Sequence, residues 1–329
     1  MKKSSYLPLI SIVTPSFNQA GFIERTIKSV INQDYPNIEY IVMDGGSTDG
    51  TIEILKKYDG RLKWFSEKDN GQADAINKGM KMVRTLRRTS EPLYQRSETP
   101  YRKPQTAIHP HPDKTGFSGT GAKGEIVAYL NSDDTYEPDT FSSVSRFFRE
   151  NPERIWVSGR CNLIDENDNP TRGFIKKYRE FWANLKLPFV FFLINFIAQP
   201  ATFWKREAFE RIGFFDTSAS LSVNPEQPYD NRPQCLPLEC RRVDESLCYA
   251  FDYDFWLRLT KLQPPVVVNR TLANFRVHPS SKGKTGPEKQ FLEDFRVVSR
   301  HTRNPFFLFC HFLSNLSLVL AYNLLRRIK

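Results

Sequence analysis

The 329-residue sequence has few cysteines, and it lacks the long apolar segment that a secretory leader would place at its start. Its five cysteines are scattered and odd in number, which fits free thiols in a reducing compartment better than a disulfide framework. Met1-Lys2-Lys3 leads almost directly into an apolar run, so we expect no cleaved signal peptide. These absences predict a cytoplasmic protein.

Several motifs of familiar protein classes are also missing. No GxSxG sequence occurs, which removes the usual argument for a serine hydrolase. The glycine motif at 119–124 precedes an expected strand, whereas a dinucleotide site requires it to follow one. His109 and His111 have no cysteine nearby to complete a zinc site.

The net charge of +10 is concentrated in appendages of the chain. Residues 85–123 hold seven Lys or Arg against three acids, and residues 300–329 hold five against none. A nucleic-acid groove would interleave base-stacking aromatic residues with this charge, and no stretch does so. We therefore expect no nucleic-acid partner, and the basic C-terminal segment suits an anionic membrane surface instead.

The remaining sequence has an ordinary globular composition, with 40% hydrophobic and 26% charged residues. Apolar runs predict buried strands at 9–13, 38–43, 62–65 and 125–130, and helical spacing lies between them at 23–31 and 49–58. This alternation predicts a parallel sheet with right-handed crossovers. Because ligands bind outside the carboxyl ends of such strands, the polar clusters that follow them should converge on one rim.

Two irregular segments, 85–123 and 217–243, are rich in residues that break periodicity and are expected to be surface loops. Two apolar segments remain. Residues 187–198 are too short to span a bilayer, and 306–325 is about long enough but includes His, Ser and Asn. The latter segment fits an interfacial helix, a helix packed on the catalytic domain, or a membrane span.

An acidic cluster directly after the fourth strand is the strongest chemical feature. Asn131-Ser132-Asp133-Asp134 begins where Leu130 ends, so its carboxylates are held at the rim of the sheet. Mg²⁺ or Mn²⁺ usually takes one or two carboxylates plus substrate phosphates, which suits a nucleoside diphosphate. A turn and helix N-cap leading into Glu137 is the structural alternative.

Two further acidic motifs each allow a functional and a structural role. Asp44 opens a Gly-rich turn after a buried strand, where it either accepts a hydrogen bond from a base or ribose or closes the turn. Asp252 and Asp254 lie among aromatic residues in a helix predicted over 247–262. Aromatic surroundings raise the pKa of a carboxylate, which suits a general base. The structural alternative is a carboxylate that faces solvent.

Taken in order, seven stretches resemble the family 2 inverting glycosyltransferases, which have the α/β GT-A fold. These stretches are 13–18, 29–33, 42–51, 66–79, 128–134, 199–203 and 252–259. The resemblance implies a Rossmann-like, mostly parallel central sheet flanked by helices. It covers a domain of about 1–280, in which 85–123 and 217–243 are insertions. Residues 281–329 remain as a C-terminal helical extension. This extension contacts a membrane if 306–325 is an interfacial helix.

The resemblance implies transfer of a sugar from a nucleotide-diphosphate donor to a hydroxyl of a glycan or lipid-linked acceptor, in polysaccharide, lipopolysaccharide or glycolipid synthesis. Asp252 takes the position of the catalytic base. Mn²⁺ or Mg²⁺ would be held by Asp133, Asp134 and His278. The positions implied for nucleotide-sugar binding are Pro15, Ser16, Phe17, Asp44, Asp69, Gln72, Asn131 and Ser132.

The sequence departs from the family pattern at two positions. Asn131 stands at the first position of the DxD motif, so the contact there must come from an amide. Phe251 precedes Asp252, where many members carry an acid. Asn131 keeps open a second function, a catalytically silent module that binds a nucleotide or glycan at a membrane. A nucleotidyltransferase is disfavoured, because residues 14–18 contain neither glycine nor a basic residue for a triphosphate.

Overall fold

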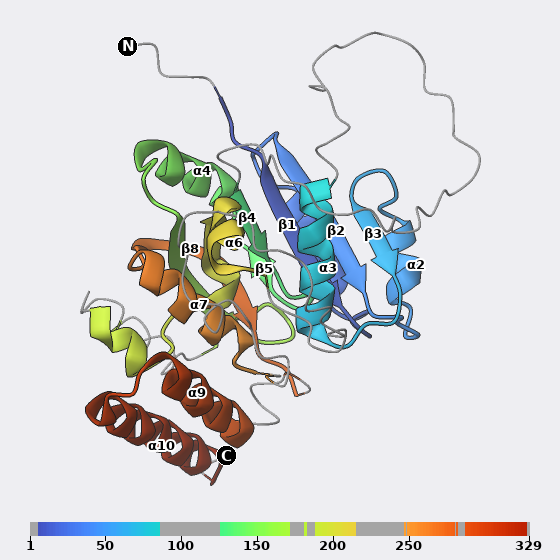
Figure 1. Cartoon of the computed structure of the whole chain (residues 1–329). Helices are drawn as coiled ribbons and strands as arrows, with labels where there is room; N and C mark the ends of the chain where they lie inside the picture. The colour runs from blue at the N-terminus through green and yellow to red at the C-terminus, as the bar shows by residue number, and fades with distance from the viewer. Residues whose placement is uncertain are drawn as a thin grey trace, which may run out of the picture.

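A computed structural model describes residues 6–85, 126–171, 181–182, 188–214, 247, 249–279, 281 and 287–327. Apart from residue 85, the segments expected to be insertions, 85–123 and 217–243, lie outside these residues. Figure 1 shows a twisted central sheet with helices against its faces and a pair of helices at the C-terminal end of the chain. The α/β fold class predicted from the sequence is confirmed.

The sheet described has the strand order β3-β2-β1-β4-β7-β6-β8-β5. The strands are β1 Ile10–Ser16, β2 Ile38–Asp44, β3 Lys63–Ser66, β4 Ile126–Tyr129, β5 Thr135–Tyr136, β6 Trp156–Ile164, β7 Thr202–Lys205 and β8 Val267–Arg276. The strands β3, β2, β1 and β4 are parallel neighbours, as the alternating sequence predicted. Beyond them β7 runs antiparallel to both β4 and β6, so the second half of the sheet is mixed.

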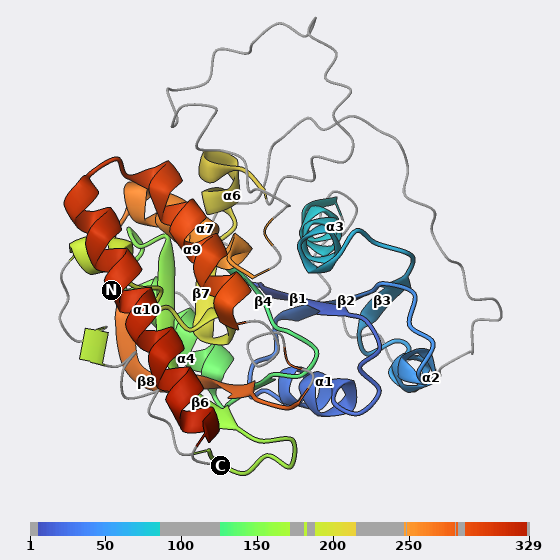
Figure 2. The same cartoon turned by 90° about the horizontal axis from the view of Figure 1, so that it is seen from below.

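Amphipathic helices cover both faces of the parallel half. Figure 2 shows α3 on one side of β1 and β2 and α1 on the other. In α1, Ile23, Ile27 and Val30 recur at helical spacing and are fully buried. The helices are α1 Ile23–Ile31, α2 Thr51–Lys56, α3 Gln72–Thr85, α4 Thr140–Glu150, α6 Glu207–Ile212, α7 Phe251–Leu262, α9 Pro287–His301 and α10 Pro305–Arg327, with short 3₁₀ helices η2 Pro188–Phe192 and η3 Gln199–Ala201.

The apolar segment 188–198 belongs to the protein core. Val190, Phe191 and Ile194 are each at most 4% exposed. The sequence showed only that residues 187–198 are hydrophobic and too few to span a bilayer. Core packing accounts for that hydrophobicity, so the segment gives no support to a membrane contact.

The C-terminal extension is helical, as expected. Helix α10 packs against α9 and η2, and α9 packs against α7. No helix in the described part of the chain combines the length and apolarity needed to cross a membrane.

Candidate active site

A cleft of about 710 Å³ lies where the loops after the parallel strands meet the C-terminal helices. Asp133, which follows β4, and Asp252, in the first turn of α7, both line it. From the sequence we expect three distant carboxylates, those of Asp44, Asp133 and Asp252, around one cleft at the edge of the sheet, and Asp133 and Asp252 are the two that line it. The structure places them together.

Most of the residues implied for substrate or metal binding also line this cleft. They are Pro15, Ser16, Phe17, Asp69, Gln72, Asn131, Ser132, Asp133, Asp252 and His278. Phe17 is 59% exposed, which leaves one face of an aromatic ring open to a base. Asp44 and Asp134 are the two implied residues that do not line the cleft.

Asp44 closes the turn after β2 and is only 1% exposed. Its Oδ2 accepts hydrogen bonds from the backbone N–H groups of Gly46 and Ser47 and from the Ser66 hydroxyl, at 2.7–3.0 Å. Its neighbour Gly45 lines the cleft in its place. The Asp44 carboxylate is therefore held by hydrogen bonds from its own turn and from β3. This is the structural role that the sequence left open as an alternative to binding a base or ribose.

Asp133 is paired with His278 at the cleft. His278 Nε2 lies 3.1 Å from Asp133 Oδ2, and His278 is 4% exposed. The Phe22 ring packs against the imidazole, with the ring centroids 4.5 Å apart. Ser281 donates a hydrogen bond from its hydroxyl to the His278 backbone carbonyl. The Phe22 ring beside the imidazole and the Ser281 hydrogen bond to the backbone of His278 therefore hold this residue in place towards Asp133.

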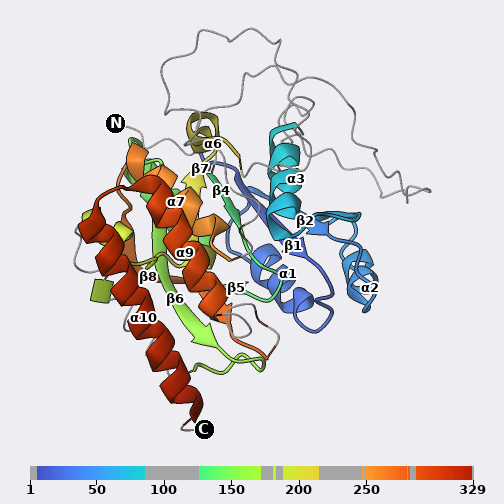
Figure 3. The same cartoon turned by 60° about the horizontal axis from the view of Figure 1, so that its bottom comes forward.

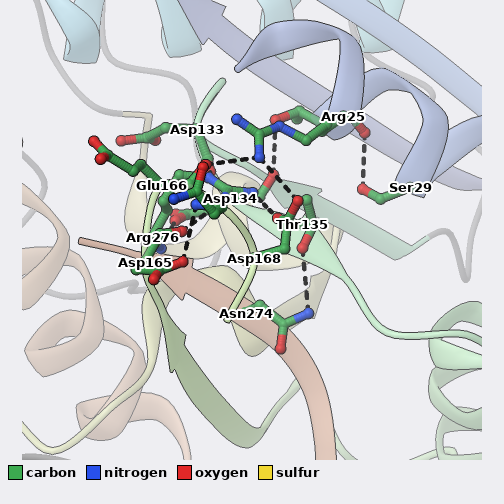
Figure 4. Close-up of polar contacts among 12 residues, drawn as sticks. Arg25, Ser29, Asp133, Asp134, Thr135, Asp165, Glu166, Asp168, Asn274 and Arg276 are labelled. Atoms are coloured by element: carbon green, nitrogen blue, oxygen red, sulfur yellow. Dashed lines mark hydrogen bonds and ion pairs between the residues drawn. The ribbon is translucent and has the colours of Figure 1, made fainter. Parts of the chain in front are cut away.

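Asp134 lies beneath the loop and is fully buried. Its Oδ1 accepts the backbone N–H of Arg276 at 2.9 Å, and the Arg276 guanidinium donates to the carbonyls of Asp133 and Asp165 and to the Asp168 carboxylate (Figure 4). Burial raises the pKa of the Asp134 carboxyl well above its ordinary value. Asp134 was implied as a metal ligand, and the structure instead turns its carboxylate away from the cleft, into the protein.

A chain of side-chain amides crosses the floor of the cleft. Gln72 Nε2 donates to Asn131 Oδ1 at 2.6 Å, and Asn131 Nδ2 lies 3.3 Å from Gln199 Oε1. Gln199 in turn donates to the Tyr129 carbonyl at 2.8 Å. Asn131, the departure from the DxD pattern, thus joins the loop after β4 to α3 and η3. An acid there would accept from Gln72 but could not donate to Gln199.

Asp252 sits in the first turn of α7, where the unsatisfied backbone N–H groups favour a carboxylate. Its Oδ1 accepts the backbone N–H of Tyr253 at 2.6 Å. Burial raises the pKa of the Tyr129 hydroxyl well above its ordinary value, and the charge of Asp252 raises it further. Asp252 is therefore close to the end of β4, next to the acidic cluster at Asn131–Asp134.

The start of α7 is fixed by a residue of α9. Glu293 Oε2 accepts the backbone N–H groups of Tyr249 and Ala250 at 2.7 and 3.1 Å. The predicted helix over 247–262 therefore begins only at Phe251, because the preceding N–H groups bind Glu293. This contact anchors the turn that carries Asp252.

Asp254 has a structural role two residues further on. It is 3% exposed, and it accepts hydrogen bonds from Arg258 Nε at 3.0 Å and from His301 Nε2 at 2.7 Å. Burial by itself would raise the pKa of Asp254, but the hydrogen bond with His301 and the charge of Arg258 hold it below its ordinary value. The pair Asp252 and Asp254 thus divides into one carboxylate at the cleft and one buried clamp between α7 and α9.

The sequence did not reveal the wall of the cleft that the C-terminal helices supply. Its lining residues there are Gln290, Phe291 and Asp294 from α9 and Asn315 and Leu318 from α10. All of them lie in the last fifty residues, outside the stretches that resemble the family. A usable signal was the polar pair His311 and Asn315, four residues apart in an otherwise apolar helix.

No group of three or more His, Cys, Asp or Glu side chains in the described part of the chain is arranged to hold a metal ion. The pair Asp133 and His278 nevertheless fits a divalent ion bound mainly through a nucleotide. Mg²⁺ commonly takes one or two protein carboxylates and completes its shell with phosphates and water. Imidazole and carboxylate together also suit Mn²⁺.

Comparison with known proteins agrees with this geometry. Residues 11–85 match the model of Glycosyl transferase family 2. An uncharacterized glycosyltransferase of Rickettsia typhi is 24% identical over 302 residues, which cover 91% of this chain and 72% of that protein. TarS of S. aureus, solved in complex with UDP-GlcNAc, has a TM-score of 0.54 at 15% identity over 90% of this chain and 67% of that one.

The mannosyltransferase PcManGT of Pyrobaculum calidifontis, solved in complex with GDP-Man and Mn²⁺, has a TM-score of 0.51 at 16% identity and covers 98% of this chain and 81% of that one. The fold, with Asp133 and Asp252 lining one cleft, is therefore that of an α/β protein of the GT-A class. The match over residues 11–85 and the similarity to other glycosyltransferases over most of the chain support a family 2 glycosyltransferase.

Proposed function

We propose that this protein transfers a sugar from a nucleoside-diphosphate donor to a hydroxyl of a glycan or lipid-linked acceptor, with inversion at the anomeric carbon. Polysaccharide, lipopolysaccharide or glycolipid synthesis is the setting, at the cytoplasmic face of a membrane. The observation that carries the proposal is that Asp133 and Asp252 line one cleft. Cys161 and Cys310, the cysteines that the structure describes, are free thiols, which fits that compartment.

The donor end of the cleft is the part next to the loops after β1 and β4. Pro15 and the exposed ring of Phe17 would receive the base, and Asp69, Gln72 and Asn131 would offer hydrogen bonds to the ribose and sugar. The amides of Gln72 and Asn131 are already held by each other, so they are oriented before the donor arrives. Such preorganisation reduces the entropy lost on binding.

Asp133 and His278 would hold Mn²⁺ or Mg²⁺ against the diphosphate of the donor. The bound ion supplies charge stabilisation for the departing diphosphate. Asp134 and Arg276 would act behind them by keeping the loop in place, since both are buried under it.

Asp252 would act as the general base. It lines the same cleft from the first turn of α7. There its carboxylate accepts the proton of the acceptor hydroxyl as that oxygen attacks the anomeric carbon. Attack from the face opposite the departing diphosphate inverts the configuration.

A panel of nucleotide sugars tests the proposal. The protein is incubated with each donor and Mn²⁺, and released nucleoside diphosphate is measured; a preferred donor should show slow, metal-dependent hydrolysis. With an acceptor in place, NMR of the first product formed should show an inverted anomeric configuration. Retention would contradict the assigned roles, and binding of a donor without any turnover would point to the catalytically silent module.

A further inference from the structure

Helix α10 has its polar and apolar faces reversed relative to a surface helix of a water-exposed protein. His311 is fully buried and Asn315 is 7% exposed, whereas Phe306, Phe309 and Phe312 are 65%, 61% and 52% exposed. A surface helix normally buries its apolar side and exposes its polar side. Whatever lies against the exposed side of α10 has to explain this reversal.

The buried polar residues fix the helix in this orientation. His311 Nδ1 donates to the Leu193 carbonyl at 3.1 Å, and Asn315 Nδ2 donates to His311 Nε2 at 3.0 Å. Burial lowers the pKa of His311 to about 4, so the ring is neutral near pH 7 and Nε2 can accept. Turning the apolar side inward would break these bonds and leave the Leu193 carbonyl without its donor.

The exposed apolar residues form one continuous strip, which we call the outer face. It consists of Phe306, Phe309, Phe312, Leu313 and Leu316, spaced three and four residues apart so that they lie on one side of the helix. Figures 1 and 3 both place α10 at the edge of the molecule, where it packs against α9 and η2. The outer face therefore lies on the boundary of the protein.

The charge around the outer face has one sign. From residue 295 to residue 329 the sequence contains six Lys or Arg and no acid. Arg296, Arg300 and Arg303, at the junction of α9 and α10, are exposed. Aromatic and aliphatic side chains that enter the acyl boundary, flanked by cations for the headgroups, are the requirements for binding an anionic lipid surface. Two copies joined by this face would bring like charges together, which is unfavourable.

We propose that the outer face of α10 docks on an anionic lipid bilayer. The opposite side of the same helix pair lines the cleft through Asn315 and Phe291. Docking would therefore put the C-terminal end of the cleft beside the membrane, where a lipid-linked acceptor is presented. This last step rests on the proposed function, whereas the docking itself does not.

Flotation with lipid vesicles tests the docking. The full chain should float with vesicles that contain phosphatidylglycerol and remain unbound with pure phosphatidylcholine, and added salt should weaken the binding. The double variant F309S/L316S should bind on the order of a hundredfold more weakly, because two large apolar side chains no longer enter the bilayer.

Tyr6→Ser is the matched control, since Tyr6 is exposed to a similar extent, at 56%, and precedes β1, a strand that lies away from α10 in Figure 1. It should bind vesicles like the unaltered protein. Both variants change exposed side chains, so both should keep the melting temperature and the donor hydrolysis in solution.

Unaltered binding by F309S/L316S would overturn the proposal. So would the absence of flotation together with a concentration-dependent dimer that the double variant abolishes, since the outer face would then join two copies. Failure of donor hydrolysis with normal flotation would contradict the proposed function and leave the docking standing.

Discussion

Asp44, beside the cleft, and Asp252, which lines it, are held in different ways. On the donor side, Asp44 is fixed mainly within its own turn by Gly46 and Ser47, two and three residues away, with one further hydrogen bond from Ser66. On the other side, the turn with Asp252 is fixed by Glu293, more than forty residues further along the chain. The first arrangement can be recognised mainly from a short sequence motif, whereas the second forms only when the chain folds.

The comparison shows where each half is vulnerable. A turn that satisfies its own polar groups keeps its shape when distant contacts are lost. A helix start that depends on another helix changes when that helix is disturbed. Substitutions on each side can separate the two cases.

Replacing Asp252 by Asn should lower the rate of sugar transfer roughly 10²–10⁴-fold, the usual contribution of a general base. The amide keeps the shape of the side chain but cannot accept the proton. Steady-state kinetics with the preferred donor measures the loss, and donor affinity should be unchanged. Near-normal transfer by this variant would show that another group acts as the base.

Arg258→Met should reduce the free energy of unfolding by about 3–5 kcal/mol, because it removes the buried guanidinium from the Asp254 carboxylate and from the Ile212 carbonyl and leaves the carboxylate with His301 alone. Denaturant unfolding measures the change. Lys28→Ala, which removes an exposed ion pair with Glu24, should cost at most about 0.5 kcal/mol. Equal effects of the two substitutions would mean that the buried pair of Arg258 and Asp254 is not a stabilising element.

Gly79→Ala should destabilise the fold by about 1–3 kcal/mol through overpacking. A Cβ at this position of α3 would lie 2.4 Å from Val13 Cγ1 on β1. Gly21→Ala is the control, because a Cβ there meets nothing within 4 Å. If thermal unfolding showed the two variants to be equally stable, α3 would not pack on β1 as closely as described.

Glu293→Ala should lower kcat by roughly tenfold, about 1.4 kcal/mol in the barrier, while the KM for the donor stays the same. The loss arises because the N–H groups before α7 lose their acceptor and the Asp252 turn becomes less ordered. Glu293→Gln, which can still accept, should restore part of kcat. A lower melting temperature with unchanged kcat would limit Glu293 to a purely structural role.

The sequence was most informative where a function depends on neighbours in the chain. The strand followed by Asn131-Ser132-Asp133-Asp134 predicted a carboxylate at the rim, and Asp133 lines the cleft. It could not show which of the two aspartates faces outward. That depends on Arg276, which lies on β8 more than a hundred residues further along the chain. Its backbone N–H donates a hydrogen bond to the Asp134 carboxylate.

Hydrophobicity alone was ambiguous in the C-terminal half. Residues 188–198 and α10 are both apolar, yet the first lies in the core and the second exposes Phe309 and Leu316. The difference comes from polar anchors: His311 and Asn315 bind inward, so the apolar side of α10 has to face outward. Contacts of this kind join distant elements and have no signature in a local pattern.

Donor binding to the Asp252→Asn protein tests the central claim most directly, since this variant should bind without turning the donor over. Calorimetric titration with the preferred nucleotide sugar should show affinity that requires Mn²⁺ or Mg²⁺. Adding Asp133→Ala should abolish that metal-dependent affinity. Unchanged metal-dependent binding in the double variant would contradict a cleft in which Asp133 holds the donor diphosphate beside Asp252.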